Sequence, residues 1–149
     1  MACSTHSIIS VSILSSMLLL SGPTMVRAGS QPASSCAEPD FDSFLHRFGR
    51  EIAFQEKSVA DPLESAFVDA TAELEPQTVS NEIPLEDVEW PIIADMTMLQ
   101  KSGHEIKISD EPEGIKKVLV RKPDTGDQQS YYFAHKPCWQ LVKMFDESL

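Results

Sequence analysis

The sequence is short of basic residues and of cysteine, and it has no long hydrophobic run. It has 12 Lys and Arg against 23 Asp and Glu, which gives a formal net charge of −11 at pH 7. The resulting field repels phosphate groups and anionic lipid surfaces, and no Lys- or Arg-rich run offsets it. We therefore expect no nucleic acid partner, and the plain explanation of the acidity is solubility.

The sequence also lacks the short motifs that identify common catalytic or cofactor-binding sites. The sequence has no phosphate-binding glycine loop, no nucleophile elbow and no cluster of metal-ligating residues. His135 and Cys138 stand three apart, but no second Cys/His pair is present to complete a zinc site. The sequence thus predicts no cofactor and no metal, and it lowers the expectation of an enzyme without removing it.

The main apolar run is IISVSILSSMLLL at residues 8–20. A membrane-spanning helix needs about 20 apolar residues, so we expect no transmembrane span in the mature chain. Gly22 and Pro23 follow the run, and Val26 and Ala28 place compact residues at the −3 and −1 positions of a cleavage site. We therefore predict a signal peptide at residues 1–28 and an exported protein, periplasmic or secreted. The alternative is a buried N-terminal helix.

Cleavage after residue 28 would remove one of the three cysteines and leave Cys36 and Cys138. In an oxidising compartment, two remaining cysteines usually form a disulfide bond. A second possibility concerns Cys36 alone, because ASSC at residues 33–36 is similar to the lipid-attachment motif of bacterial lipoproteins. A lipid on Cys36 would anchor the protein to a membrane and would exclude the disulfide, so the two remain alternatives.

A helix is predicted to follow a flexible tether. Residues 29–39 are small and polar and include prolines, which is typical of a tether. Asp40 suits the N-cap position of a helix, and Pro62 ends the helical region at or before the preceding residue. Between them lies a continuous apolar stripe at helical spacing, made of Phe41, Phe44, Leu45, Phe48 and Ile52.

Strand patterns dominate the last third of the chain. We expect strands at residues 105–109, 115–122, 128–134 and 138–145, with a hairpin loop at 123–127 whose Pro and Gly suit a tight turn. Earlier segments are less regular: a short strand within 63–74, mostly loop over 73–87, and a short helix or broken strand over 88–99. Alternation in the last strand would place four residues on one face: Trp139, Leu141, Lys143 and Phe145.

The stretch FDSFLHRFGREIAFQEKSVADPL resembles the opening of an exported bacterial family of unknown function within the nuclear transport factor 2-like (NTF2-like) superfamily. A Trp near Trp90 and a closing strand like CWQLVKMFDES complete the likeness, which covers residues 40–149. The residues that carry the first part are Phe41, Phe44, Phe48, Phe54, Gln55, Pro62 and Leu63. The resemblance implies a single α+β domain at 40–149, in which an N-terminal amphipathic helix packs on a curved antiparallel sheet shaped as a cone around a hydrophobic pocket.

The leading hypothesis is a non-catalytic, periplasmic or envelope-associated domain that binds a small ligand or a protein partner in that apolar pocket. A homodimer through the open sheet face is common in the resembled superfamily and is also compatible with the sequence. Lys143 would either extend to the rim or hold an anionic ligand. The pocket candidates are Trp90, Tyr131, Phe133, Trp139, Lys143 and Phe145.

Two other functions stay open. One is a small acid–base enzyme of the isomerase or dehydratase type, because the resemblance implies that enzymes of the superfamily place a carboxylate or an Asp–His pair in the pocket. Asp69, Asp95 and His135 are the candidates, since they lie within or beside apolar segments, and His135 is the best single one. The other is a structural or assembly lipoprotein anchored through Cys36.

Overall fold

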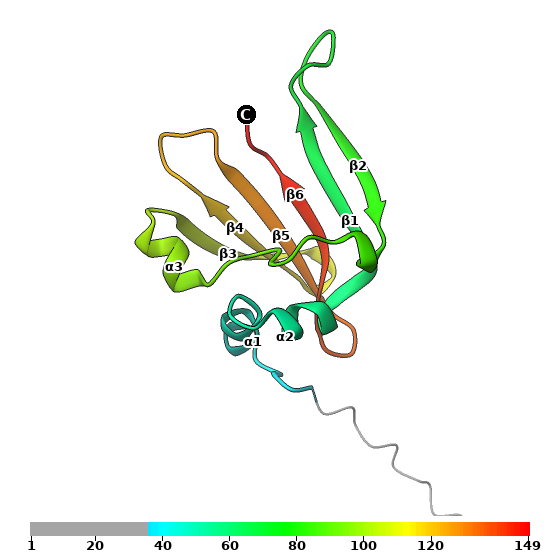
Figure 1. Cartoon of the computed structure of the whole chain (residues 1–149), viewed down its shortest axis with the longest axis vertical. Coiled ribbons are helices and arrows are strands. Elements are labelled where there is room, and N and C mark those ends of the chain that lie inside the picture. Colours follow the sequence, from blue (N-terminus) through cyan, green and yellow to red (C-terminus); the bar gives the residue numbers. More distant parts are fainter. Residues whose placement is uncertain (1–35) are drawn as a thin grey trace, which may run out of the picture. The chain divides into compact units, whose positions relative to one another are not determined.

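The computed structural model describes residues 36–149; the predicted signal peptide and residues 29–35 of the predicted tether lie outside the described residues. Within that range a curved sheet is flanked by short helices (Figure 1). None of the described helices is long and apolar enough to cross a membrane. The elements are α1 (Phe41–Phe48), α2 (Ile52–Lys57), β1 (Val59–Asp69), β2 (Gln77–Ile83), η1 (Leu85–Asp87), α3 (Met96–Lys101), β3 (Glu105–Glu111), η2 (Pro112–Gly114), β4 (Ile115–Arg121), β5 (Gln128–His135) and β6 (Trp139–Asp146).

The six strands form one sheet in the order β2-β1-β6-β5-β4-β3. Four neighbouring pairs are antiparallel, and β1 runs parallel to β6. Helices α1 and α2 lie at the end of the sheet next to the β5–β6 turn, whereas the C-terminus lies at the other end (Figure 1). The predicted α+β class, with an N-terminal amphipathic helix on a curved sheet, is confirmed.

The N-terminal helix begins where the sequence predicts. Asp40 is the N-cap of α1, and its carboxylate accepts a hydrogen bond from the Ser43 amide at 2.9 Å. The predicted apolar stripe, however, is shorter than expected. Glu51 is extended, with φ −119° and ψ 103°, so it separates α1 from α2. Ile52 therefore leaves the stripe and is 47% exposed.

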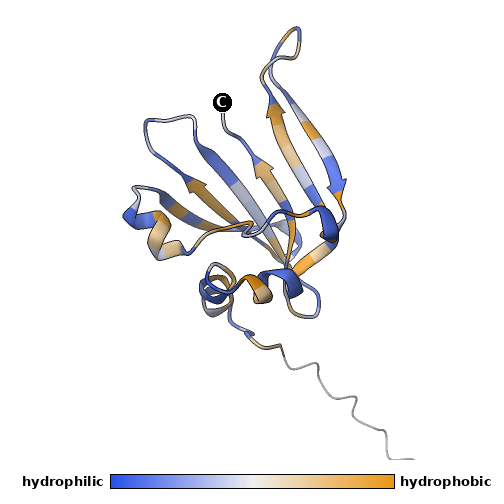
Figure 2. Ribbon diagram, in the orientation of Figure 1, coloured by the Kyte–Doolittle hydropathy of each residue, from blue (hydrophilic) through white to orange (hydrophobic). Residues whose placement is uncertain are grey.

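The core is built on the phenylalanines of α1. The rings of Phe41, Phe44 and Phe48 surround Phe133 of β5, with centroid separations of 5.5, 5.7 and 5.4 Å. These edge-to-face contacts bury large apolar area and fix the helix over the sheet. Strands β1, β4 and β6 supply much of the remaining hydrophobic surface (Figure 2).

Two predictions about the strands are wrong. Residues 77–83, predicted as loop, form β2, which pairs with β1 along its whole length. The alternation predicted for β6 also fails, because the register between β5 and β6 shifts after Leu141. Such a bulge inserts one extra residue in a strand and reverses the facing of the residues beyond it. Trp139 and Leu141 therefore lie on the core face, whereas Lys143, beyond the bulge, lies on the other.

Cys36 and Cys138 form a disulfide bond, with sulfurs 2.05 Å apart and Cα atoms 5.4 Å apart. The segment between Cys36 and the start of α1 has a second attachment, because the Trp139 Nε1–H donates to the Pro39 carbonyl at 3.1 Å. Residues 36–39, within the predicted tether, are thus fastened to the start of β6.

Candidate ligand-binding cavity

The chain between β2 and β3 has to cross the sheet, because these two strands form its opposite edges. Two side chains from elsewhere hold this crossing segment in place. Gln55 of α2 is fully buried; its Nε2 donates to the Ile93 carbonyl at 2.8 Å, and its Oε1 accepts from the Ile92 amide at 2.9 Å. Tyr131 of β5 donates from its hydroxyl to the Ile92 carbonyl at 3.3 Å. Ile92 is therefore held through both its amide and its carbonyl.

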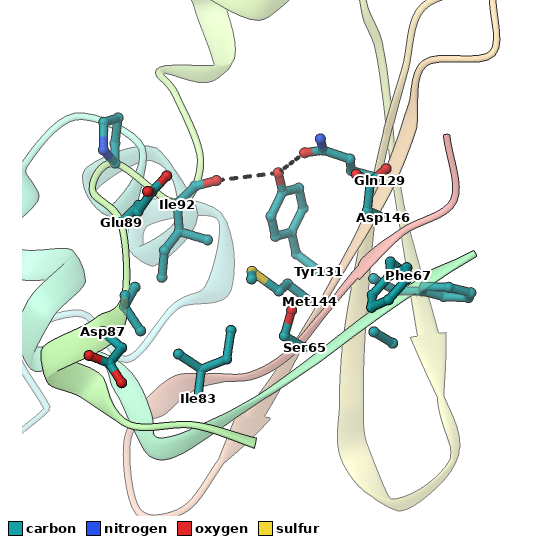
Figure 3. Close-up of a pocket in the computed structure, with 14 residues that line it drawn as sticks. Ser65, Phe67, Ile83, Asp87, Glu89, Ile92, Gln129, Tyr131, Met144 and Asp146 are labelled. Carbon is teal, nitrogen blue, oxygen red and sulfur yellow. Dashed lines mark hydrogen bonds between the residues drawn. The ribbon is translucent and has the colours of Figure 1, made fainter. Parts of the chain in front are cut away.

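A cavity of about 500 Å³ lies between the crossing segment and the sheet (Figure 3). Its volume is within the range of small-molecule sites in proteins. Much of its wall is apolar, with carboxylates and an amide added. The lining residues are Ser65, Ala66, Phe67, Ile83, Asp87, Val88, Glu89, Pro91, Ile92, Gln129, Tyr131, Met144, Phe145 and Asp146.

Tyr131 occupies the centre of this wall, and only 5% of the residue is exposed. Its hydroxyl contacts the Oε1 of Gln129 in a short hydrogen bond as well as the Ile92 carbonyl (Figure 3). Burial, and then the negative charges of Asp146 and Asp127, raise the pKa of Tyr131 to about 12. The phenol is therefore neutral at ordinary pH, and its hydrogen is already shared between two protein acceptors.

Three carboxylates belong to the cavity. Asp87 and Glu89 come from the crossing segment, and Asp146 comes from the end of β6, on the opposite side of Tyr131 (Figure 3). All three are exposed, so they stand where the cavity meets solvent. None of the described residues that line the cavity is Lys, Arg or His.

A second, smaller cavity of about 300 Å³ shares Tyr131, Ile92, Gln129 and Pro91 with the first. It also includes His104, whose Nε2 lies 3.3 Å from Asp127 Oδ2. The other ring nitrogen lies 2.9 Å from the Ser102 hydroxyl and 3.3 Å from the Leu99 carbonyl. Both ring nitrogens of His104 are thus engaged within the protein.

Of the residues predicted for the pocket, Tyr131 and Phe145 line the cavity. Phe133 is fully buried beneath α1. Trp139 lies at the other end of β6, where it lines a separate hollow beside the disulfide. Trp90, within the crossing segment, is half-buried and packs against the core.

Lys143 takes neither of the two roles considered for it. Its Nζ lies 2.8 Å from Glu64 Oε1, and 5.8 Å from the centroid of the Tyr132 ring, on the face away from the core. The hydrogen bond from Lys143 is the main cause that lowers the pKa of Glu64, with a smaller contribution from the Ser80 hydroxyl. Lys143 therefore joins β1 to β6 across the outer face of the sheet.

The structure places the three predicted catalytic candidates outside the cavity lining. His135 is exposed near the β5–β6 turn, and its ring packs on Trp139 with centroids 4.8 Å apart. Asp69 accepts hydrogen bonds from the hydroxyl and the amide of Thr71, which lower its pKa. Asp95 is the N-cap of α3 and accepts from the Met98 amide.

Sequence reasoning missed the groups that give the cavity its polar character, namely Asp87, Glu89, Gln129 and Asp146. The only sequence signal for two of them is the acidic stretch LEDVEW, which by itself predicts a solvated loop. Among residues 36–149, no group of three or more His, Cys, Asp and Glu is placed to hold a metal ion.

No family model matches the chain, and no curated protein matches it either. Among solved structures, it is similar to an NTF2-like protein from Bacteroides fragilis NCTC 9343, with 18% sequence identity and a TM-score of 0.55. The match covers 80% of this chain and 51% of that protein, so the chain spans about half the length of the structure it resembles. A likeness at this identity shows the fold alone: this chain has an NTF2-like fold.

Proposed function

We propose that this protein is an exported, non-catalytic domain that binds a small ligand in the cavity around Tyr131. The observation that carries the proposal is the cavity itself, of about 500 Å³, with a wall that combines apolar side chains with a few polar groups in defined positions. This combination is the usual form of a small-molecule site. The signal-peptide pattern at residues 1–28 supports export, and the Cys36–Cys138 bond suits an oxidising compartment.

Tyr131 supports a binding role over a catalytic one. A general acid or base works best when its pKa is near the operating pH. Burial moves the pKa of Tyr131 the other way, to about 12, and its hydrogen is shared with Gln129 and Ile92. The one lining group that is both buried and titratable is therefore poorly suited to proton transfer.

An acid–base enzyme is the second candidate, and His104 with Asp127 is the observation in its favour. Their side chains are 3.3 Å apart at the smaller cavity. The contacts of His104 with Ser102 and Leu99 nevertheless occupy its other nitrogen, so no ring nitrogen is left for a substrate. A lipoprotein anchored at Cys36 is disfavoured as well, because a sulfur in a disulfide cannot carry a lipid.

The binding proposal is tested with Nile red, a neutral apolar dye whose fluorescence rises in apolar sites. We expect saturable binding of one dye per protein. Ser65→Phe fills the cavity from β1 and should abolish binding. The matched control is Ser80→Phe on the neighbouring strand β2, where the hydroxyl bonds Glu64 on the opposite face of the sheet. Unchanged dye binding by Ser65→Phe, with both variants folded by circular dichroism, would refute the proposal.

A further inference from the structure

The polar atoms that the cavity offers to a ligand are mostly hydrogen-bond acceptors. Ionised Asp87, Glu89 and Asp146 can only accept. The Tyr131 hydroxyl would ordinarily donate, but its single hydrogen already faces Gln129 Oε1 and the Ile92 carbonyl. Among the lining side chains, donors are thus left only on Ser65 and on the amide nitrogen of Gln129.

The charges of the cavity lining also favour a ligand that donates hydrogen bonds and is not anionic. Asp87 and Glu89 lie on one side of Tyr131 and Asp146 lies on the other, so negative charge is present at both ends of the cavity (Figure 3). No described lining residue carries a compensating positive charge. The net charge of −11 adds a long-range field of the same sign. An anionic ligand would meet repulsion here and few donors.

The apolar side chains of the cavity wall favour a ligand whose body is hydrophobic. The apolar lining side chains include Val88 after η1, Ile83 at the end of β2, Phe67 of β1 and Met144 of β6. A hydrophobic body placed between them is desolvated, while a charged head can stay at the exposed carboxylates and keep part of its hydration.

We infer that the cavity takes an organic cation, namely an apolar body of one or two rings that carries a protonated amine. The body packs against Met144, Ile83 and Val88, and the ammonium group donates to the carboxylates at one end of the cavity, either Asp146 or Asp87 and Glu89. This inference rests on the proposed function, because it names the ligand class of the same cavity.

The test compares three probes with the same ring system and different charge: 1-naphthylmethylamine, 1-naphthylmethanol and 1-naphthoate. Each is titrated into the ¹⁵N-labelled, oxidised protein at pH 7, and amide shifts of the lining residues report affinity and place. We expect the amine to bind about tenfold more tightly than the alcohol, and the carboxylate to bind most weakly. The preference should shrink in about 0.5 M salt, because the carboxylates are exposed.

Two double variants locate the charge effect. Glu89→Gln/Asp146→Asn should bring the amine and the alcohol to within about twofold of each other and leave the affinity for the alcohol unchanged. Glu56→Gln/Glu113→Gln removes the same number of negative charges at exposed positions on α2 and in the η2 turn, outside the lining, and should keep the preference.

Each remaining outcome counts against the inference. If the alcohol or the carboxylate binds as tightly as the amine, the cavity binds ligands but does not select cations. If the control double variant loses the preference equally, the net charge and not the cavity is responsible. If none of the three probes shifts the lining amides and Nile red does not bind either, the inference and the proposed function fail together.

Discussion

Replacing Gln55 with Met removes the side chain that holds the crossing segment against α2. Methionine has a similar length and no hydrogen-bonding amide, so the substitution keeps the volume and deletes both bonds. The Ile93 carbonyl, whose bond is buried, and the half-buried Ile92 amide then lose their partners. Loss of the partner of a buried polar group costs about 1–3 kcal/mol. Because one of the two groups keeps some access to water, we expect the free energy of unfolding to fall by about 2–4 kcal/mol.

Gln55→Glu tests the two hydrogen bonds separately, because it keeps the acceptor for Ile92 and removes the donor to Ile93. An ionised Glu still accepts from the Ile92 amide, but its second oxygen faces the Ile93 carbonyl, which is also an acceptor. Protonation restores a donor, so burial raises the pKa of this carboxyl in the folded state. A raised folded pKa gives stability that is present at low pH and lost as pH rises. The deficit of Gln55→Glu relative to the native protein should therefore shrink between pH 7 and pH 5, whereas that of Gln55→Met should stay constant.

Urea unfolding followed by tryptophan fluorescence measures the stability of both variants, because Trp90 lies in the crossing segment, two residues before Ile92. Gln100→Met, an exposed change of the same kind on α3, is the control and should stay within about 0.5 kcal/mol of the native protein. A Gln55→Met protein as stable as the control, or a Glu variant whose deficit does not depend on pH, would show that Gln55 does not hold the segment.

Three other contacts lead to further predictions. Reduction of the disulfide, or the double variant Cys36→Ser/Cys138→Ser, opens a loop that joins two residues separated by 102 positions. The free energy of unfolding should fall by about 2–5 kcal/mol and the m-value should rise. A fall in unfolding free energy of less than about 1 kcal/mol would contradict this expectation. In an ultraviolet titration, the Tyr131 phenol, identified by its absence in the Tyr131→Phe variant, should ionise only near pH 12, and the unfolding free energy should fall as pH rises from about 10 to that value. Ionisation of Tyr131 near pH 10 would show that its hydroxyl is not buried. Because the pKa of Glu64 is lowered in the folded state, the ionised Glu64 stabilises the native protein above about pH 4.5, and this stabilisation is lost as pH falls below that value. Lys143→Met should therefore reduce the fall in unfolding free energy below pH 4.5, and an unchanged fall would contradict the Lys143–Glu64 ion pair.

The features that sequence reasoning predicted correctly are those with local causes. The start of α1 follows from a capping Asp40 and phenylalanines at helical spacing, and the β4–β5 hairpin follows from Pro and Gly in a short loop. Strand β2 was missed for a physical reason. As an edge strand, it is mostly exposed and its residues are polar, so it lacks the hydrophobic alternation that marks a half-buried strand. Only its pairing with β1 identifies it.

The bulge in β6 explains why Lys143 is not a pocket residue. Simple alternation treats Leu141, Lys143 and Phe145 as one face, but the shifted register moves Lys143 to the outer face, opposite Tyr132. A bulge arises from the fit between two strands and leaves no mark in the residue pattern of one. The same shift brings Met144 opposite Tyr131, where it becomes part of the cavity wall.

The cavity itself depends on the segment whose sequence is least regular. Within the crossing segment, the backbone of Ile92 and Ile93 is bonded by a helix side chain and a strand side chain, Gln55 and Tyr131, that stand 76 residues apart in the sequence. Its conformation is therefore set by distant partners and not by local propensity, which is why no periodicity predicts it. Segments held in this way open at a lower free energy than the core does. A ligand that contacts both the segment and the sheet would stabilise the closed arrangement by binding only to it. Amide exchange at Ile92 and Ile93 should accordingly slow in the presence of the amine probe, while exchange at core positions such as Phe133 stays unchanged.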